Sequence, residues 1–564
     1  MWPASEVPAT VMQKESFASY DDFIRRYRAD VPAHFNFAFD VVDRIAAESP
    51  TRRAMIHVDD GEARRAYDFR FFSEESSLLA AGLAKQGMAK GDRVVLMLYR
   101  RVEFWTCLLA LHKLGAVAVP LPAKVSVKDI EYRLQFGRIK GAIIDESMAD
   151  KVDKARATCP TVQLAVQVGG SRPPKGWIDF GALRASGQDG AGSIRKTASG
   201  SDPLFVFFSS GTTGAPKMVQ HDHNYALGHC VTAMYWHDLR PDDIHLTIAD
   251  SGWAKAAWGK LYGQWVAGAT VFVYDFRGKF DAHKFLELMA RHRVTTFCAP
   301  PTVYRLMIHQ HLKQYDLSAL RQCTSAGELL NRDIFDAWKK ATGLSLYEGY
   351  GQTETTLQIA TFPFMKVKPG SMGRPCPDWD VVLLDERDEP VPVGQEAEIC
   401  IRLGKNHPLG FFHGYDGDPE LTNSVIRNGY YHTGDKAYVD ADGYYWFLGR
   451  NDDLIKSSGY RIGPFEVESV LATHPAVRES AVTGLPDAVR GQIVKATVVL
   501  APGYAPSEEL VQELQDHVKS ITAGYKYPRI IEFVEELPKT ISGKIRRAEI
   551  RARDALTYPT VKRS

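Results

Sequence analysis

The chain has 564 residues, of which 45% are hydrophobic and 24% are charged, and its formal net charge is +1. These values are typical of a globular protein with roughly three or four domain-sized units. The balanced charge gives no bulk electrostatic reason to expect binding to nucleic acid or to an anionic membrane surface.

The cysteines and the N-terminal residues indicate the compartment. Seven cysteines are scattered along the chain without a CxxC pair, which argues against a disulfide framework and against a zinc site. The first thirty residues carry five acidic side chains and no apolar signal segment. No apolar run reaches the roughly 18 residues that a membrane-spanning helix needs. We therefore expect a cytoplasmic protein without a membrane span.

The first half of the chain alternates strands and helices. Residues 1–35 are predicted to form an N-terminal extension with helical pieces. Apolar strands follow at 92–98, 117–121, 204–208, 269–274 and 294–299, with amphipathic helices at 102–114 and 282–291. This alternation predicts an α/β fold with two parallel sheets, each covered by helices on both faces.

The pattern changes twice in the second half. From about residue 370, short strands at 381–384, 397–401, 430–433 and 444–448 are separated by Gly, Asp and Asn turns, which predicts a small antiparallel β-barrel. Beyond residue 451, helices at 464–473 and 507–521 and strands at 479–482, 494–500 and 530–534 predict a small α+β unit. The predicted division is 1–35, 36–451 and 452–564.

A loop rich in hydroxyls and glycine follows the strand at 204–208. It consists of Ser209, Ser210, Gly211, Thr212, Thr213, Gly214, Ala215, Pro216 and Lys217. Glycine lets backbone N–H groups turn towards an anion, and hydroxyls add donors or Mg²⁺ ligands, so the loop is a candidate phosphate cradle. It lacks the Gly-Lys-Ser/Thr ending of a P-loop. Taken alone, a loop of this composition is more often plain turn chemistry than a phosphate site.

Four more motifs follow downstream. Residues 348–354 offer a tyrosine face for stacking on a purine and a glutamate oxygen for Mg²⁺. Asp435 follows a turn and suits the two hydroxyls of a ribose, and Arg450 ends the next strand. The run 457–461 and a lysine on a Gly-Ser turn, Lys544, complete the set. Each of them, taken singly, is also explained as a turn or surface residue.

Together, in this order and spacing, the motifs resemble those of the adenylate-forming superfamily, which comprises acyl-CoA synthetases, adenylation domains and luciferases. The resemblance extends from about residue 40 almost to the end, and runs 458–464 and 525–529 are most similar to the medium-chain acyl-CoA synthetase branch. It implies an ATP- and Mg²⁺-dependent ligase that makes acyl-AMP, releases pyrophosphate and then transfers the acyl group to coenzyme A.

The resemblance also implies roles in adenylation. Ser209–Lys217 would hold the β- and γ-phosphates, with Thr212 and Glu354 at Mg²⁺. Lys544 would bridge the acyl carboxylate and the α-phosphate, where a cation stabilises the developing charge. The remaining residues implied to contact the nucleotide are Gly327, Glu328, Glu348, Gly349, Tyr350, Gly351, Gln352, Thr353, Asp435, Phe447 and Arg450.

Transfer to coenzyme A implies a second set of residues. The C-terminal domain would rotate about Asp452, as a hinge residue absorbs a φ/ψ change. Ser458, Gly459 and Tyr460 would then line the thiol tunnel. Arginine suits phosphate because its fork binds bidentately, so the residues implied to meet the nucleotide of coenzyme A are Arg490, Ser520 and Arg529. Surface ion pairing is the alternative role for both arginines.

The acyl pocket is implied to include Trp253, Lys255, Trp258, Gly351, Thr353 and Arg461. Acetate-specific relatives have a tryptophan where this chain has Gly351, so we expect open space there and poor use of acetate. Burial of an unpaired ammonium is costly. Lys255 should therefore point outward or pair with a polar group of the substrate.

The expected substrate is a medium-chain, branched or aromatic carboxylic acid, and the expected partners are this acid, ATP and coenzyme A, with a homodimer left open. An aryl-CoA ligase of the benzoate type and an adenylation enzyme that loads a carrier protein are the enzymatic alternatives. A non-catalytic acyl- or nucleotide-binding protein is a third, which the presence of Lys544, Glu354 and Asp435 opposes.

Overall fold

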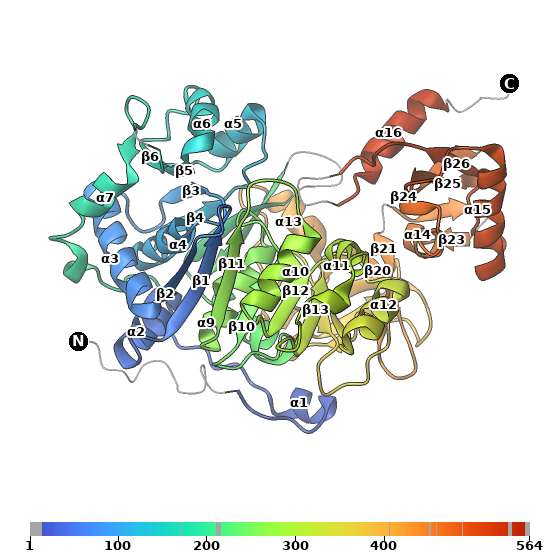
Figure 1. The fold of residues 1–564 in the computed structure, drawn as a ribbon, viewed down its shortest axis with the longest axis horizontal. Helices are drawn as coiled ribbons and strands as arrows, with labels where there is room; N and C mark the ends of the chain where they lie inside the picture. The colour runs from blue at the N-terminus through green and yellow to red at the C-terminus, as the bar shows by residue number, and fades with distance from the viewer. Residues whose placement is uncertain are drawn as a thin grey trace.

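The computed structural model describes residues 14–170, 172–209, 216–404, 407–450, 453–457, 460–487, 489–539 and 544–558 (Figure 1). The predicted extension contains the helix α1 (Tyr20–Arg26), which is capped by the hydroxyl of Ser19 and buries Phe23. Within the described residues, no helix combines the length and the apolar character that crossing a membrane requires.

The first parallel sheet has seven strands among the described residues. Their order is β7 (Ile178–Asp179), β6 (Leu164–Val168), β5 (Gly141–Asp145), β3 (Arg93–Met97), β4 (Val117–Pro120), β8 (Pro203–Ser209) and β9 (Lys217–Asp222). All neighbours are parallel except β8 and β9, which pair antiparallel with Ser209 opposite Lys217. The candidate phosphate loop therefore connects two antiparallel strands, whereas a P-loop connects a strand to a helix.

The second sheet has nine strands among the described residues. Their order is β16 (Arg374–Pro375), β15 (Ile359–Ala360), β14 (Leu346–Tyr350), β13 (Gln322–Ala326), β12 (Thr296–Ala299), β10 (Ile244–Thr247), β11 (Thr270–Asp275), β1 (Arg53–Asp59) and β2 (Arg64–Asp68). The central pairs are parallel and both edges are antiparallel. The prediction of two parallel-type sheets is confirmed.

Alternation of side chains along the strands places the helices. In β3, Val95 and Met97 face a core with α5 and α6, while Val94 and Leu96 face the larger core that lies between the two sheets. Helices α10, α11 and α12 cover the outer face of the second sheet (Figure 1). The helices of this part are η2 (Ala38–Asp43), α2 (Arg44–Glu48), α3 (Phe69–Lys85), α4 (Val102–Leu114), α5 (Val127–Phe136), η3 (Glu146–Met148), α6 (Ala149–Arg156), α7 (Phe180–Ser186), η4 (Ala191–Ser193), α8 (Tyr225–Cys230), η5 (Val231–Trp236), η6 (Ala257–Leu261), α9 (Gly263–Val266), α10 (Ala282–Arg291), α11 (Pro301–Ile308), η7 (Leu312–Gln314) and α12 (Arg332–Thr342).

The antiparallel unit that the sequence predicts follows. Its strands are β17 (Val381–Leu384), β18 (Ala397–Arg402), β19 (Ile426–Arg427), β20 (Tyr430–Val439) and β21 (Tyr445–Arg450), with α13 (Pro419–Val425) beside them. All the pairs are antiparallel, and β20 and β21 place Asp435 opposite Arg450. Two of the predicted nucleotide residues therefore meet through sheet register.

The C-terminal unit stands apart at the right of Figure 1. It contains β22 (Ile455–Ser457), β23 (Tyr460–Ile462), α14 (Pro464–Leu471), β24 (Val477–Asp487), β25 (Gly491–Leu500), α15 (Glu508–Ile521), β26 (Ile530–Phe533) and α16 (Arg547–Thr557). β24 and β25 exceed the predicted lengths because they form one long hairpin, in which pairing extends the strand through Pro486 and Asp487. The proposed hinge Asp452 lies outside the described residues, and the domain boundary stays a prediction.

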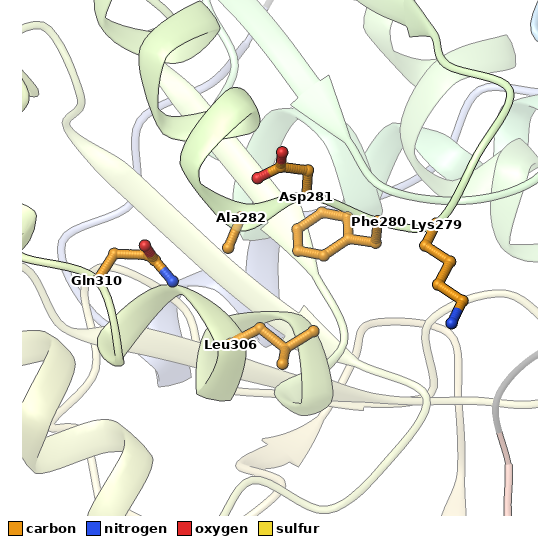
Figure 2. A pocket seen from close by; sticks show the side chains of 6 residues that line it. All are labelled: Lys279, Phe280, Asp281, Ala282, Leu306 and Gln310. Atoms are coloured by element: carbon orange, nitrogen blue, oxygen red, sulfur yellow. The ribbon is translucent and has the colours of Figure 1, made fainter.

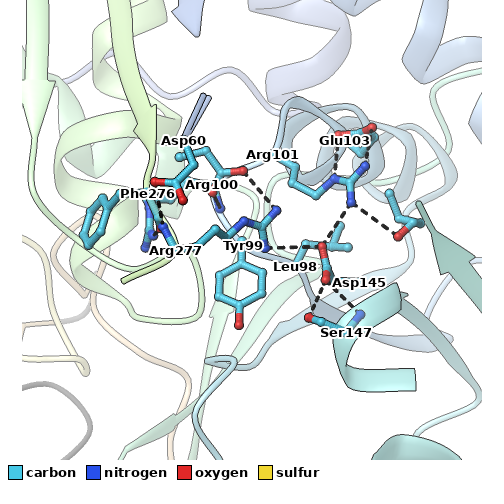
Figure 3. Close-up of polar contacts among 12 residues, drawn as sticks. Asp60, Leu98, Tyr99, Arg100, Arg101, Glu103, Asp145, Ser147, Phe276 and Arg277 are labelled. Atoms are coloured by element: carbon cyan, nitrogen blue, oxygen red, sulfur yellow. Dashed lines mark hydrogen bonds and ion pairs between the residues drawn. The ribbon is translucent and has the colours of Figure 1, made fainter. Parts of the chain in front are cut away.

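A buried carboxylate joins the two parallel sheets (Figure 3). Asp145 ends β5, and its Oδ2 lies 3.1 Å from Nη1 of Arg101, beyond β3, and 3.6 Å from Nη1 of Arg277, beyond β11. Its Oδ1 accepts hydrogen bonds from the backbone N–H and the hydroxyl of Ser147. The guanidinium of Arg277 also lies 4.0 Å from the ring centre of Tyr99. This cluster fixes the carboxyl ends of the strands, where α/β proteins place their sites.

We expect Asp145→Ala to lower the free energy of unfolding by about 1–3 kcal/mol, because it removes a buried acceptor from Ser147 and leaves Arg101 and Arg277 with only Glu103 and Asp275 as carboxylate partners within the described residues. Urea denaturation measures the change. The matched control is Asp380→Ala, which removes an exposed partner 3.1 Å from Arg402 and should cost at most about 1 kcal/mol. Equal effects of the two substitutions would contradict the role assigned to Asp145.

Candidate active site

The ends of the candidate phosphate loop lie beside Glu354, although residues 210–215 are outside the described part of the chain. Ser209 ends β8 and Lys217 begins β9. The Nζ of Lys217 lies 5.0 Å from the ring centre of Tyr415, and the hydroxyl of Tyr415 donates a 2.9 Å hydrogen bond to Oε1 of Glu354. Glu354 is partly buried, and its carboxylate is the kind of oxygen donor that Mg²⁺ prefers. A cation and a candidate metal ligand thus flank one tyrosine.

Asp435 is the centre of a buried hydrogen-bond network. Its Oδ2 accepts hydrogen bonds from the hydroxyl of Tyr350 at 2.6 Å and from Nε2 of Gln352 at 2.7 Å. The hydroxyl of Tyr431 donates to Oε1 of Gln352, which fixes the orientation of the amide. Nη1 of Arg450 lies 3.9 Å from Oδ1. Burial raises the pKa of the Asp435 carboxyl, and Arg450, Tyr350, Gln352 and Lys544 oppose that rise.

Lys544 belongs to the C-terminal unit but acts on groups of the N-terminal part. Its charge favours the ionised form of Asp435. The pKa of the Lys255 amine is lowered, mainly by burial and in part by the charge of Lys544. Lys544 itself is exposed. The structure therefore brings the predicted catalytic lysine, the predicted ribose carboxylate and the predicted acyl wall within electrostatic reach of one another.

The wall at 250–258 differs from expectation in two respects. Lys255 is partly buried and donates a 2.6 Å hydrogen bond to the carbonyl oxygen of Ala326, so it neither points outward nor lacks a partner. The predicted open space beside Gly351 is filled, and that expectation is wrong. A Cβ on Gly351 would lie 2.3 Å from the carbonyl oxygen of Thr356 and 2.7 Å from the Trp258 ring. The indole comes from η6, which no pattern around Gly351 indicates.

The predicted adenine residues separate into two groups. Gly327 and Glu328 follow β13, and Oε2 of Glu328 accepts a 2.6 Å hydrogen bond from the hydroxyl of Thr302. The Tyr350 and Phe447 rings lie 6.3 Å apart. The Glu348 side chain instead lies within the fold, where burial raises the pKa of its carboxyl well above the ordinary value.

Three other residues of this region have supporting positions. Gly349 packs closely against other side chains, since a Cβ there would lie 2.7 Å from atoms of Leu357 and Trp236. The carbonyl oxygen of Thr353 lies 2.7 Å from Nε2 of His221. Trp253 is partly buried at the start of the acyl wall.

The predicted coenzyme A residues lie on the C-terminal unit. The Tyr460 ring is half exposed and stacks on Tyr525 at 4.0 Å between ring centres. Nη1 of Arg529 donates to the hydroxyl of Tyr527, and the hydroxyl of Ser520 donates to the carbonyl of His517. Arg490 and Arg529 both act on the carboxylate of Asp487. Ser458, Gly459 and the side chain of Arg461 lie outside the described residues.

Two features of the structure do not belong to this site. An open depression of about 460 Å³ between α10 and α11 is lined by Lys279, Phe280, Asp281, Ala282, Leu306 and Gln310, none of which is a predicted site residue (Figure 2). Glu398, Cys400 and His432 are close enough to share a metal ion. However, Nη2 of Arg427 lies 3.1 Å from Nδ1 of His432, so a positive group already occupies that position.

Tyr415 and Tyr431 were missed by sequence reasoning. Both are aromatic residues whose hydroxyls hold predicted site residues, Glu354 and Gln352. Tyr415 ends the aromatic run 411–415 and Tyr431 begins the motif that carries Asp435, and buried tyrosine hydroxyls usually have a hydrogen-bond partner.

Comparison with family models gives two matches. The model described as AMP-binding enzyme matches residues 42–415, and the model described as AMP-binding enzyme C-terminal domain matches residues 466–544. The two matches cover the parallel sheets and most of the C-terminal unit.

Similar curated proteins include mitochondrial acyl-coenzyme A synthetases. ACSM3 of Mus musculus is 39% identical, with 96% of this chain and 94% of that protein covered. ACSM5 of Homo sapiens is 41% identical, with 97% and 95% covered. Among solved structures, the anthranilate CoA ligase AuaEII in complex with anthranoyl-AMP has a TM-score of 0.83 at 32% identity, covering 94% of this chain and 99% of its own. The acyl-CoA synthetase of Brucella canis has a TM-score of 0.72 at 32% identity, covering 96% and 99%.

The donors around Asp435 generate a prediction about pH. Tyr350→Phe removes an O–H donor from the carboxylate, which raises the pKa of Asp435 further. On acidification, the Asp435 carboxylate of the variant is then protonated at a higher pH than that of the parent protein. AMP affinity, measured by calorimetry across a pH series, should therefore weaken at a higher pH than in the parent protein.

Two controls accompany this measurement. Asp435→Asn should abolish the part of the loss of AMP affinity at low pH (the acid limb of the pH profile) that protonation of this carboxylate causes. Tyr444→Phe removes a buried hydroxyl that donates to the carbonyl of Lys366, and it should leave the limb in place. An acid limb that is the same for Tyr350→Phe and the parent protein would rule out control by Asp435.

Proposed function

Because this chain belongs to the AMP-binding enzyme family and is an ATP-dependent, AMP-forming acyl-CoA synthetase, we propose that it activates a medium-chain, branched or aromatic carboxylic acid at the centre formed by Asp435, Lys255 and Lys544. The observation that supports this proposal is the hydrogen-bond network at Asp435, whose Oδ2 accepts from Tyr350 and Gln352 and whose Oδ1 lies 3.9 Å from Arg450. In this proposal Asp435 serves the nucleotide, the wall at 250–258 serves the acyl group, and Lys544 supplies a cation between them.

The first half-reaction forms acyl-AMP. A carboxylate oxygen of the acid attacks the α-phosphorus of ATP, and the bond to the bridging oxygen breaks so that pyrophosphate leaves. Asp435 holds the ribose and Arg450 supports it. Lys544 lies between the carboxylate and the α-phosphate, where its charge offsets the negative charge that develops. The loop Ser209–Lys217 holds the β- and γ-phosphates.

Glu354 is the described residue to which we assign the binding of Mg²⁺. The Glu354 carboxylate would hold the ion together with Thr212 of the phosphate loop, and the bound ion would neutralise phosphate charge. The hydrogen bond from Tyr415 to Oε1 leaves the other carboxylate oxygen of Glu354 as the donor for a cation.

The second half-reaction forms the thioester. The sulfur of coenzyme A attacks the acyl carbonyl, the thiol proton is lost, and AMP leaves. We assign the residues of the C-terminal unit to this step after rotation about Asp452. Tyr460, with Ser458 and Gly459, would line the thiol path, while Arg490, Ser520 and Arg529 would meet the phosphates. The exposed face of the Tyr460–Tyr525 stack is consistent with a partner that arrives in a second domain orientation.

The side chains of residues 250–258, which would form one wall of the acyl pocket, favour a particular type of carboxylic acid. The Trp258 indole fills the space beside Gly351, and the ammonium of Lys255 sits near Gly327. An aromatic or branched acid suits an indole wall, and a polar substituent suits Lys255. An anthranilate CoA ligase is among the similar structures. Thr353 and Arg461 complete the proposed pocket.

An aryl-CoA ligase is the second candidate function. The proposed compartment is the cytoplasm, although the named relatives are mitochondrial.

The direct test is pyrophosphate release over a panel of carboxylic acids, with and without coenzyme A. We expect release with medium-chain, branched or aromatic acids and weak release with acetate. Sustained turnover should require coenzyme A. Turnover that instead requires a carrier protein would favour the adenylation-enzyme alternative, and no release with any acid would contradict the proposal.

Lys544→Ala should lower the rate of adenylation by roughly 10²–10³-fold, the usual cost of losing a group that stabilises developing charge. Thioester formation from preformed acyl-AMP should be retained. Pyrophosphate exchange measures the first step and CoA thioester formation the second. Equal loss of both steps would remove this role from Lys544.

Trp258→Ala should raise kcat/KM for bulkier acids relative to smaller ones, by about 10-fold or more for each methylene accommodated. Gly351→Ala is the matched comparison. Its Cβ would lie 2.3 Å from the backbone carbonyl oxygen of Thr356 and 2.7 Å from the Trp258 ring, and because the backbone carbonyl cannot move aside, activity should fall with every acid. An unaltered size preference in Trp258→Ala would exclude this indole from the acyl pocket.

A further inference from the structure

The helix α16 begins at Arg547, three residues after Lys544, and its first two turns are held by two carboxylates from separate elements. Oδ1 of Asp453 lies 2.6 Å from Nη1 of Arg551, and Oδ2 lies 3.8 Å from Nη1 of Arg547. Nη2 of Arg547 donates to both carboxylate oxygens of Glu468 at 2.7 Å. These ion pairs are mostly buried, because the side chains of Asp453, Arg547 and Glu468 are 13%, 16% and 8% exposed.

The two carboxylates have different places in the unit. Glu468 lies on α14, and its Oε1 also accepts a 2.6 Å hydrogen bond from the backbone N–H of Val482 in β24. Glu468 therefore joins α16 to the body of the C-terminal unit. Asp453 instead lies on the segment that enters this unit from β21, where its N–H donates to the carbonyl oxygen of Arg450. Asp453 therefore joins α16 to the strand that carries Arg450.

The rest of α16 is attached independently of Asp453. Ile550 is buried against Ala481, Val499 and Leu537. Asp554 pairs with the fully buried Lys495. Loss of the Asp453 carboxylate therefore leaves the helix docked and removes only the tie between its first two turns and the incoming segment.

We propose that Asp453 is a positioning residue for Lys544, which acts through Arg551 and Arg547 to fix the start of α16 relative to Arg450 and Asp435. The inference rests on the adenylation role proposed above for Lys544. The physical reason is geometric, since a misplacement of about 1 Å at a reacting centre can cost roughly 10²-fold in rate. Without the Asp453 carboxylate, Glu468 still ties the start of α16 to the C-terminal unit, but these ion pairs no longer tie it to the strand of Arg450, so the helix start and Lys544 can shift relative to Asp435.

The test separates the two half-reactions in Asp453→Asn, which keeps the size of the side chain and removes its charge. We expect kcat for pyrophosphate exchange to fall about 10²-fold, while KM for ATP and the rate of thioester formation from preformed acyl-AMP change by less than about 3-fold. Asp453→Glu should recover part of the exchange rate. A merely structural role would lower both half-reactions together and would not be rescued.

Arg551→Gln removes the same ion pair from the other side, so it should also lower pyrophosphate exchange and spare thioester formation. The double variant should exchange pyrophosphate no more slowly than the slower single variant. Asp516→Asn is the matched control, because it removes an exposed carboxylate that pairs with Lys519 on α15. It should leave both half-reactions unchanged. If Asp453→Asn fails to fold, Arg551→Gln carries the test alone.

The outcomes distinguish this inference from the function on which it depends. Full adenylation by Lys544→Ala would overturn the role of the lysine itself. Loss of adenylation in Lys544→Ala, together with an unchanged rate in Asp453→Asn and Arg551→Gln, would overturn only the positioning role. Equal losses in both half-reactions for Asp453→Asn would overturn it as well.

Discussion

The hydrogen bonds to Asp435 connect parts of the chain that fold as separate sheets. Tyr350 ends a strand of the nine-stranded sheet and Gln352 follows it, while Asp435 and Arg450 face each other in the antiparallel unit. Burial disfavours a carboxylate, so the ionised form depends on these donors and on nearby cations. The same atoms that join the two sheets therefore also determine the charge of the carboxylate to which we assign the ribose.

The charges at the centre are arranged for anionic reactants. The charges of Lys544 and Lys255 repel each other, and the charge of Lys544 adds to burial in lowering the pKa of the Lys255 amine. In the function that we propose, a carboxylate and a phosphate would lie between the two amines and offset this repulsion. Preorganised charge of this kind favours the transition state because it needs little reorganisation during the reaction. The hydrogen bond from Lys255 to Ala326 holds one of the two cations in place.

Most of the fold could be predicted from the sequence because long amphipathic segments have strong periodicity. The helices at 102–114 and 282–291 have the predicted bounds. Strands β22 and β23 could not be predicted, since each has only three residues and no clear apolar pattern; they pair with each other, and β22 also pairs with β25 through Ser457 and Gly491. The motifs predicted which residues gather at Asp435. They could not predict that Trp258 fills the space beside Gly351, because that contact joins elements with no local relation in sequence.

The C-terminal unit carries residues assigned to both half-reactions, and this limits how it can work. Lys544 acts on Asp435 in the described arrangement, while Tyr460 stacks on Tyr525 with half of its surface exposed. The ion pairs of Asp453 and Glu468 tie α16 to the unit, so the lysine cannot leave the site by itself. In the function that we propose, one body presents two surfaces in turn, and the proposed rotation about Asp452 would remove the lysine and deliver the thiol path together.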